Sequence, residues 1–245
     1  MAGITTRYWD CCKPSCSWSD KAAFTHPVAT CAADGETVQS DVFLASGCDG
    51  GPAFSCTNNM PWAVTASFAL GFGAAIIPGL TEADLCCACY ELTFTSPAIL
   101  GKKMVVQLTN TGALFDNHFD IQIPGGGLGG VTGCMRQWNN GFDAIYNRAD
   151  CQTLPAPLRP GCEFRFDWFD DNPTMTFRRV GCPRELTDRT SCIRSDESNY
   201  STYPVPTGSV SPRASPLTGV LCVILALCMW NFSFRCSDLS HVRWL

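Results

Sequence analysis

The chain has 245 residues and a formal net charge of −5, and only 16% of its residues are charged. An acidic chain without runs of Lys and Arg has no basic face for a phosphate backbone, so no nucleic-acid partner is expected. Its length allows one large domain or two small ones with a substantial core.

Short apolar segments separated by Pro, Gly and Asn predict a mainly β fold with long loops. Six strands are expected, in chain order, at residues 5–10, 89–94, 103–108, 119–123, 164–169 and 174–180. A helix is expected at 61–75, although Gly71 and Gly73 weaken it. A short second helix is expected to begin at Thr81, where acidic residues favour a helix N-terminus.

Alternation along two of these strands predicts which side chains share a face. The first strand places Thr6, Tyr8 and Asp10 on one face and Trp9 on the other, where it is expected to join the core. The strand around Asp120 places that carboxyl on the polar face, opposite an apolar one. The sequence therefore presents two aspartates on strand faces or strand ends.

Cysteine is unusually abundant, with 17 in the chain, of which 14 lie between Cys11 and Cys192. An even number at this density predicts disulfides formed in an oxidising, secretory compartment. Zinc is the rival reading, but no CxxC pairs recur at zinc-finger spacing and only three His are present, so no metal is expected.

The start of the chain conflicts with a secretory compartment, because residues 1–8 contain neither a basic segment nor an apolar one of the kind found in a leader. We therefore expect a secreted, extracellular protein whose leader is missing from this sequence. A monomer is expected.

Composition divides the chain into three parts. Residues 1–195 are expected to form the cysteine-linked domain, and 196–215 a linker rich in Ser, Thr and Pro. The tail, 216–245, has a strongly apolar core of only 220–230, marginal for a membrane span. Three readings of the tail stay open: a membrane anchor or cleaved lipid-anchor signal, read-through sequence, or a packed extension. A membrane is a partner only under the first reading.

Carboxylates and aromatic residues are the candidate functional groups, because motifs for other kinds of catalysis are absent. The sequence contains no nucleophile elbow, HExxH, phosphate loop or dinucleotide fingerprint. Two carboxyls suffice for glycoside hydrolysis, where one protonates the leaving oxygen and the other activates water or attacks the sugar. Asp10, beside Cys11 and Cys12, and Asp120 are the candidates, and no cofactor is expected.

The opening TTRYWDCCKPSC at 5–16 resembles the signature of the family 45 glycoside hydrolases, small endoglucanases of fungi, protists and invertebrates. The resemblance covers about 4–195. It continues through PWAV at 61–64, FALGF at 68–72, CCACYELTF at 86–94, GKKMVVQ at 101–107, NHFD at 117–120, PGGG at 124–127 and RFDWF at 165–169.

This resemblance implies a six-stranded double-psi β-barrel that cleaves internal bonds of a β-1,4-glucan polysaccharide, its substrate, with inversion. It implies that Asp10 is the general base and Asp120 the general acid, with His118 assisting the acid. An inverting pair stands roughly 6.5–9.5 Å apart, which leaves room for a water. The resemblance also implies that the groove is lined by Thr6, Tyr8, Trp18 and Tyr146.

The same resemblance implies seven disulfides, which the sequence alone does not pair. They are Cys11–Cys134, Cys12–Cys48, Cys16–Cys86, Cys31–Cys56, Cys87–Cys192, Cys89–Cys182 and Cys151–Cys162. The chain departs from the family in the loop 112–117, which is one residue short. A third aspartate that is thought to assist the acid falls here at Asp116, and we expect it either to act from that shifted position or to be a plain loop carboxylate.

Three non-hydrolytic readings compete with an enzyme. An expansin-type protein shares the barrel but has no base in the position of Asp10, so the presence of Asp10 favours hydrolysis. A barwin-like sugar-binding protein would lack both the opening motif and the acid. An inactivated relative that only binds polysaccharide is suggested by the altered loop 112–117.

Overall fold

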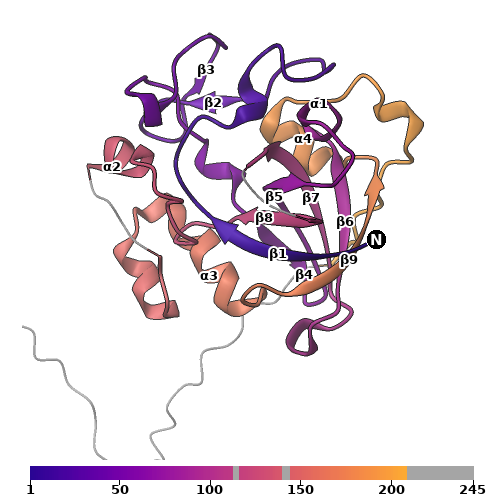
Figure 1. Cartoon of the computed structure of the whole chain (residues 1–245). Coiled ribbons are helices and arrows are strands. Elements are labelled where there is room, and N and C mark those ends of the chain that lie inside the picture. Colours follow the sequence, from indigo (N-terminus) through magenta and orange to yellow (C-terminus); the bar gives the residue numbers. More distant parts are fainter. Residues whose placement is uncertain (113–115, 140–143, 209–245) are drawn as a thin grey trace, which may run out of the picture. The chain divides into compact units, whose positions relative to one another are not determined.

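The computed structural model describes residues 1–112, 116–139 and 144–208 and centres on a closed barrel of six strands (Figure 1). Around the barrel the strands are β5 (Phe68–Ile76), β7 (Lys103–Asn110), β6 (Cys89–Phe94), β9 (Thr174–Val180), β1 (Ala2–Tyr8) and β8 (His118–Gln122). The pairing of β8 with β5 closes the circle. The β1–β8 and β5–β7 pairs are parallel and the others antiparallel. The predicted mainly β, double-psi barrel is thereby confirmed.

The barrel interior is filled by apolar side chains that alternate along its strands. Phe119 and Ile121 of β8 are fully buried there, in one cluster with Met104 and Leu108 of β7. Because successive side chains of a strand point to opposite faces, Asp120 lies on the outside of the barrel. The predicted alternation of this strand is correct, and it puts the carboxyl at the surface.

The helix predicted at 61–75 is wrong, because these residues form β4 (Trp62–Thr65) and β5. The strand β5 is buried on both faces: Ala69 and Ala75 pack in the interior cluster, and Phe68 and Phe72 in a second cluster outside the barrel. A strand buried on both faces has a continuous apolar sequence, which periodicity does not distinguish from a buried helix.

The strand predicted at 164–169 is also wrong, because most of it belongs to α3 (Arg159–Asp167). Pro160 stands in the first turn, where a proline is tolerated. Phe164 and Trp168, four residues apart, stack with ring centroids at 5.3 Å on one side of the helix. The aromatic residues of this segment satisfy a helical period as well as an alternating one.

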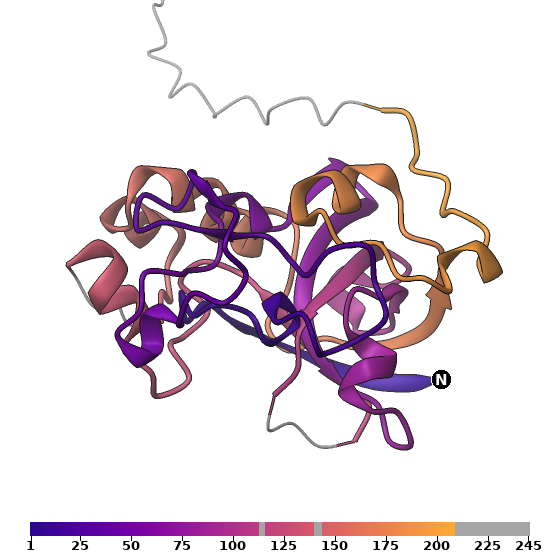
Figure 2. The same ribbon diagram turned by 90° about the horizontal axis from the view of Figure 1, so that it is seen from above.

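The short helix predicted from Thr81 is confirmed as α1 (Glu82–Leu85), where Thr81 and Asp84 form a capping box. Figure 2 shows the other helices arranged around the barrel. The remaining described elements are α2 (Gly133–Trp138), α4 (Arg184–Thr190), β2 (Thr30–Cys31), β3 (Val38–Gln39) and 3-10 turns at Ser15–Ser17, Gly47–Asp49, Thr57–Asn59, Pro97–Ile99, Arg148–Thr153, Ala156–Leu158 and Glu197–Asn199.

Seven disulfides tie the long loops to the barrel and to one another. Their pairing is the one that the family resemblance implies: Cys11–Cys134, Cys12–Cys48, Cys16–Cys86, Cys31–Cys56, Cys87–Cys192, Cys89–Cys182 and Cys151–Cys162. All 14 cysteines up to Cys192 are therefore bridged, which agrees with the disulfide reading of the sequence and not with the zinc reading.

The first part of the predicted linker 196–215 packs against the barrel. Tyr203 stacks on Phe68 with ring centroids 5.6 Å apart, and Val205 joins the same outer cluster. Residues 209–215 and the predicted tail 216–245 lie outside the described residues. Among the residues that are described, no helix combines the length and the apolar character needed to cross a membrane.

Candidate active site

The carboxyl of Asp120 lies where two barrel strands meet. The parallel register of β1 and β8 places Thr6 opposite Asp120. On the other side of β8, Asp120 is paired with β5, whose Gly73 backs it closely: a Cβ on Gly73 would lie 2.6 Å from the Asp120 carbonyl oxygen. A glycine is therefore needed here for β5 and β8 to approach, and the backbone of Asp120 is held from both sides.

One hydroxyl joins the acid candidate to the neighbouring imidazole. Thr6 Oγ1 donates to Asp120 Oδ1 at 2.7 Å and lies 2.7 Å from His118 Nε2. A hydroxyl has a single hydrogen, so while Thr6 donates to the carboxylate its oxygen accepts from the Nε2–H of His118. When Asp120 is protonated the two bonds can reverse. The predicted neighbourhood of His118 and Asp120 is present, with Thr6 between them.

Asp10 lies two residues beyond the end of β1, in a segment that is rigidly held. The adjacent Cys11 and Cys12 are bridged to different loops, and Cys11 has a positive φ of 60°, which a side chain rarely adopts. The Cys12 backbone N–H donates to Asp10 Oδ1 at 2.9 Å. Gly133 approaches so closely that a Cβ there would lie 2.5 Å from the Asp10 carbonyl oxygen. The predicted clamp around Asp10 is therefore real.

Burial raises the pKa of both carboxyls to about 6. For Asp120, the negative charge of Asp10 raises the pKa further, while the Thr6 hydrogen bond and Arg7 lower it. For Asp10, the hydrogen bond from Cys12 opposes the effect of burial. With the pKa raised in this way, each carboxyl holds its proton at pH values at which exposed carboxyls are ionised.

Tyr8 lies near enough to both carboxyls to be affected by their charges. Burial raises the pKa of its phenol well above the usual value, and the charges of Asp10 and Asp120 both raise it further. The amide of Asn110 donates to the Tyr8 hydroxyl at 3.4 Å. Trp9, by contrast, is buried in a separate apolar cluster. The predicted division of this strand into a site face and a core face is therefore correct.

Trp18, predicted to be a sugar platform, is half-buried and has a cation on one face. The Lys13 ammonium lies 3.3 Å from the centroid of the Trp18 ring, a cation–π contact. The same ammonium donates to the carbonyls of Val42 at 2.6 Å and Leu44 at 2.9 Å. The face of the indole that Lys13 covers is therefore not available to a ligand.

Tyr146 and Asp116 are more loosely connected to the carboxyls. Tyr146 is 75% exposed and lies near Arg7. Burial lowers the pKa of Arg7, and Tyr146 partly offsets this effect. Asp116 is exposed, has a positive φ of 58° and follows residues 113–115, which lie outside the described residues. It is not among the groups that shift the pKa of Asp120. The suggested assistance from Asp116 stays a prediction.

Sequence reasoning missed Lys13, Asn110 and Gly73 as parts of the site. Lys13 stands inside the opening motif, and its position directly after Cys11 and Cys12 was the available signal. Asn110 ends β7, where its side chain carbonyl accepts from the Ser15 N–H at 2.9 Å and its amide reaches Tyr8. Gly73 was read only as a helix breaker, although a glycine inside a strand often marks a close backbone approach.

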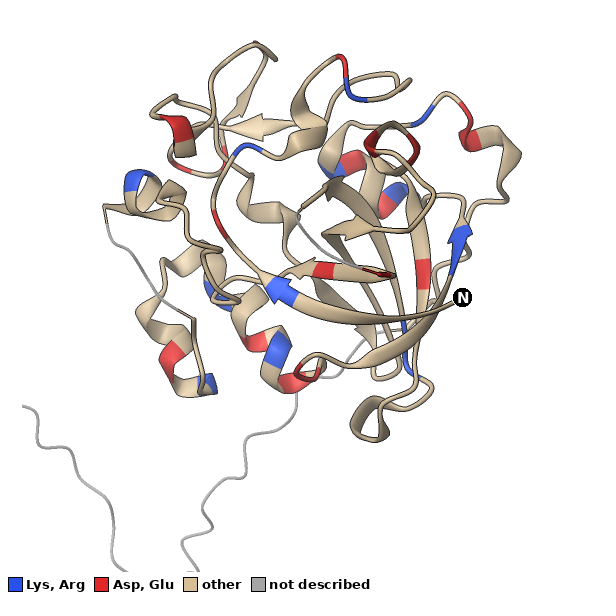
Figure 3. Ribbon diagram, in the orientation of Figure 1, with Lys and Arg blue, Asp and Glu red and all other residues tan. Residues whose placement is uncertain are grey.

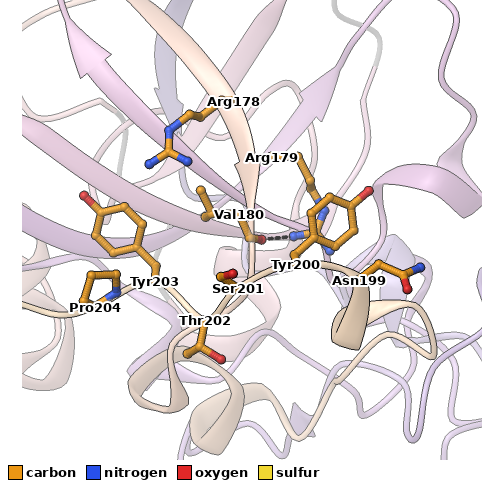
Figure 4. Close-up of a pocket in the computed structure, with 9 residues that line it drawn as sticks. All are labelled: Arg178, Arg179, Val180, Asn199, Tyr200, Ser201, Thr202, Tyr203 and Pro204. Carbon is orange, nitrogen blue, oxygen red and sulfur yellow. Dashed lines mark hydrogen bonds between the residues drawn. The ribbon is translucent and has the colours of Figure 1, made fainter.

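A cavity of about 360 Å³ lies elsewhere on the molecule, between the end of β9 and the segment 199–204 (Figure 4). Its lining includes Arg178, Arg179, Tyr200 and Tyr203 but neither Asp10 nor Asp120. Figure 3 shows acidic and basic residues interspersed along the described elements. Within these elements, no three His, Cys, Asp or Glu side chains are grouped to hold a metal ion.

Comparison with known proteins identifies similar chains. The family model described as "Glycosyl hydrolase family 45" matches residues 2–193. An endoglucanase of Cryptopygus antarcticus is 50% identical over 204 residues, which cover 79% of this chain and 90% of that protein. A putative endoglucanase type K of Fusarium oxysporum is 46% identical over 223 residues, which cover 87% of this chain but only 59% of the relative.

The fold has a counterpart of known structure. The crystal structure of a cellulase from the Antarctic springtail Cryptopygus antarcticus aligns with a TM-score of 0.76 at 48% identity, covering 79% of this chain and 97% of that one. That cellulase therefore shares the fold of this chain, and nearly half of the aligned residues are identical.

Proposed function

The chain belongs to glycosyl hydrolase family 45, and we propose that it is an endo-β-1,4-glucanase that cleaves internal bonds of cellulose or a related β-glucan with inversion. In this proposal Asp10 is the general base and Asp120 the general acid. The observation that carries the proposal is the pair of clamped carboxyls, both with a pKa raised to about 6, in one environment on the barrel surface.

The reaction needs one carboxylate and one carboxylic acid at the same pH. Asp10, as the carboxylate, takes a proton from a water whose oxygen attacks the anomeric carbon from the face opposite the leaving group. The bond from that carbon to the glycosidic oxygen breaks, and Asp120 gives its proton to the leaving oxygen. The pair therefore gains one proton at Asp10 and loses one at Asp120, and exchange with solvent restores both.

The surroundings of the two carboxyls support this division of roles. The negative charge of Asp10 raises the pKa of Asp120, which favours Asp120 as the group that keeps the proton. The backbone N–H of Cys12 donates to Asp10, which favours the ionised form of the base. His118 and Thr6 hold the acid in place and offer its proton a hydrogen-bonded route.

A β-glucan substrate is supported by the family and its endoglucanase relatives and by Thr6 and Tyr8 near the carboxyls. The apolar faces of glucose rings pack on aromatic faces, and hydroxyls bind the sugar edges. The proposed sugar contacts are Tyr8, Trp18 and the exposed Tyr146. Thr6 also lines the groove, and its hydrogen bonds to Asp120 and His118 orient the acid. Seven disulfides support a secreted, extracellular setting.

The proposal is tested by reducing-end release and viscosity loss on soluble carboxymethyl-cellulose, using the oxidatively folded chain beside its Asp120→Ala variant. A fast drop in viscosity with few new ends, absent in the variant, is the expected result for an endo-acting enzyme. A folded parent that binds cellulose but releases no new ends would instead support the alternative, an expansin-like or inactivated polysaccharide-binding protein.

A further inference from the structure

Phe43 is a large aromatic side chain that the described fold leaves 75% exposed. Single exposed apolar residues are common and need no explanation by themselves. Phe43 differs from them because hydrogen bonds hold the backbone on both sides of it. Lys13, which makes two of these bonds, also contacts Trp18.

The short loop that carries Phe43 is held by its own hydrogen bonds. The Phe43 N–H donates to Asp41 Oδ1 at 2.9 Å, an Asx turn. The carbonyls before and after Phe43, those of Val42 and Leu44, both accept from the Lys13 ammonium at 2.6 and 2.9 Å. With both flanking carbonyls turned toward Lys13, the Phe43 side chain is displayed to solvent on a fixed backbone.

The ammonium that holds this loop also covers one face of Trp18. Lys13 Nζ lies 3.3 Å from the ring centroid, so its donors serve two carbonyls and one aromatic ring. The loop and the indole are therefore neighbours through a single group. Lys13 therefore joins the loop of Phe43 and the indole of Trp18 in one assembly.

This assembly is attached to the segment that carries Asp10. The Cys12–Cys48 disulfide links the two segments, and the Lys13 N–H donates to Ser46 Oγ at 3.2 Å. A glucan chain that packs on Trp18 would therefore lie close to the loop of Phe43, because Lys13 contacts both the indole and that loop.

We propose that Phe43 is a sugar-binding residue that extends the platform of Trp18 and sets how long a glucan chain the groove grips. The proposal rests on the β-glucanase function proposed above. A glucose ring would pack its apolar face on the phenyl ring. Because Phe43 stands on a fixed backbone and has only two side-chain torsions, ordering it on binding costs little entropy.

The test is calorimetric titration of cellohexaose into the Asp120→Ala protein, which separates binding from turnover, with Phe43→Leu, Phe43→Trp and Leu100→Ala added in turn. Phe43→Leu keeps an apolar side chain on the loop but removes the aromatic face, and it should weaken the Kd roughly three- to tenfold. Phe43→Trp should bind at least as tightly as the parent. Leu100 is 68% exposed on the turn between β6 and β7, and Leu100→Ala should change nothing.

The outcomes are separate for the two proposals. Absence of β-glucan hydrolysis by the protein that retains Asp120 contradicts the proposed function, while the titration of the Asp120→Ala protein still reports on Phe43. A Kd that is the same in Phe43→Leu as in the parent overturns the inference, and so does equal weakening by Phe43→Leu and Phe43→Trp, because that would be the mark of a disturbed loop. Near-ultraviolet circular dichroism of each variant confirms that Trp18 keeps its environment.

Discussion

Thr6 donates its hydroxyl hydrogen to Asp120 Oδ1 at 2.7 Å, across the parallel pairing of two barrel strands. The bond stabilises the carboxylate form of Asp120, while burial and the nearby charge of Asp10 favour the carboxylic acid. The pKa of about 6 is the balance of these opposing effects. An acid that both holds a proton and releases it near that pH is suited to protonating a leaving oxygen.

Replacement of Thr6 by Val should raise the pKa of Asp120, because the variant loses the donor to the carboxylate. We expect the alkaline limb of the kcat profile to move to higher pH, and kcat at its optimum to fall on the order of tenfold because the acid is less well oriented. The measurement is a pH–rate profile on a soluble cello-oligosaccharide.

Thr6→Ser serves as the matched control, since it keeps the hydroxyl and should keep the alkaline limb in place. An alkaline limb that stays where it is in Thr6→Val would show that Thr6 does not govern the ionisation of Asp120.

Replacement of Asp10 or Asp120 by its amide should stabilise the fold at neutral pH. A group whose pKa rises from 3.8 when unfolded to about 6 when folded binds more protons in the folded state between these values, so stability falls as pH rises through that window. Each carboxyl then costs up to roughly 3 kcal/mol at pH 7, at about 1.4 kcal/mol per unit.

Denaturant unfolding of Asp10→Asn and Asp120→Asn beside the parent tests this prediction. The stabilisation should be present at pH 7 and absent at pH 3, where the parent carboxyls are protonated in both states. Variants that are less stable than the parent at pH 7 would contradict the burial cost assigned to these groups.

Replacement of Gly73 by Ala should displace Asp120, because the new Cβ would lie 2.6 Å from the Asp120 carbonyl oxygen. We expect a stability loss of about 1–3 kcal/mol and a fall in kcat of up to about a hundredfold. Ala75→Gly in the same strand removes a buried methyl without pressing on Asp120, so it should lose stability but keep kcat. Equal kcat in Gly73→Ala and the parent would show that this contact does not position the acid.

Replacement of Lys13 by Met should loosen the loop 41–44 and the Trp18 ring together. The variant keeps the buried stem but loses the ammonium that serves two carbonyls and the indole. We expect KM on long glucans to rise several-fold with little change in kcat, and tryptophan fluorescence to shift. Lys21→Met is the control, because it removes only a partly exposed ion pair with Glu82, worth at most about 1 kcal/mol. It should leave KM and the tryptophan fluorescence unchanged.

Part of the fold could be predicted from sequence because the local pattern had one physical explanation. The strand at Asp120 alternates cleanly because one face fills the barrel with apolar side chains and the other carries the polar side chains of His118, Asp120 and Gln122. The helix that follows Thr81 has a capping box formed by Thr81 and Asp84, two residues that can be recognised in the sequence. The two wrong elements, 61–75 and 164–169, failed because β5 is buried on both faces and because the aromatics of α3 fit two periods.

The candidate site was predicted unevenly for similar reasons. Asp10 and Asp120 stand in distinctive motifs, and their neighbours Thr6, Tyr8 and His118 are near them in sequence or in strand register. Lys13, Gly73 and Phe43 act through contacts that only the folded chain brings together: an ammonium over a ring, a glycine behind a carbonyl, a loop pinned by a distant lysine. No local pattern contains those contacts, so sequence reasoning had no signal strong enough to find them.

The most direct test of the carboxyl pair is the anomeric configuration of the first product, followed by proton NMR as cellohexaose is cleaved at a pH near 6. Direct attack of water activated by Asp10 predicts that the α-anomer forms first and then mutarotates, and that Asp120→Asn releases none. A β-anomer formed first would mean a covalent intermediate and retention, and it would contradict the assignment of Asp10 as a base acting through water.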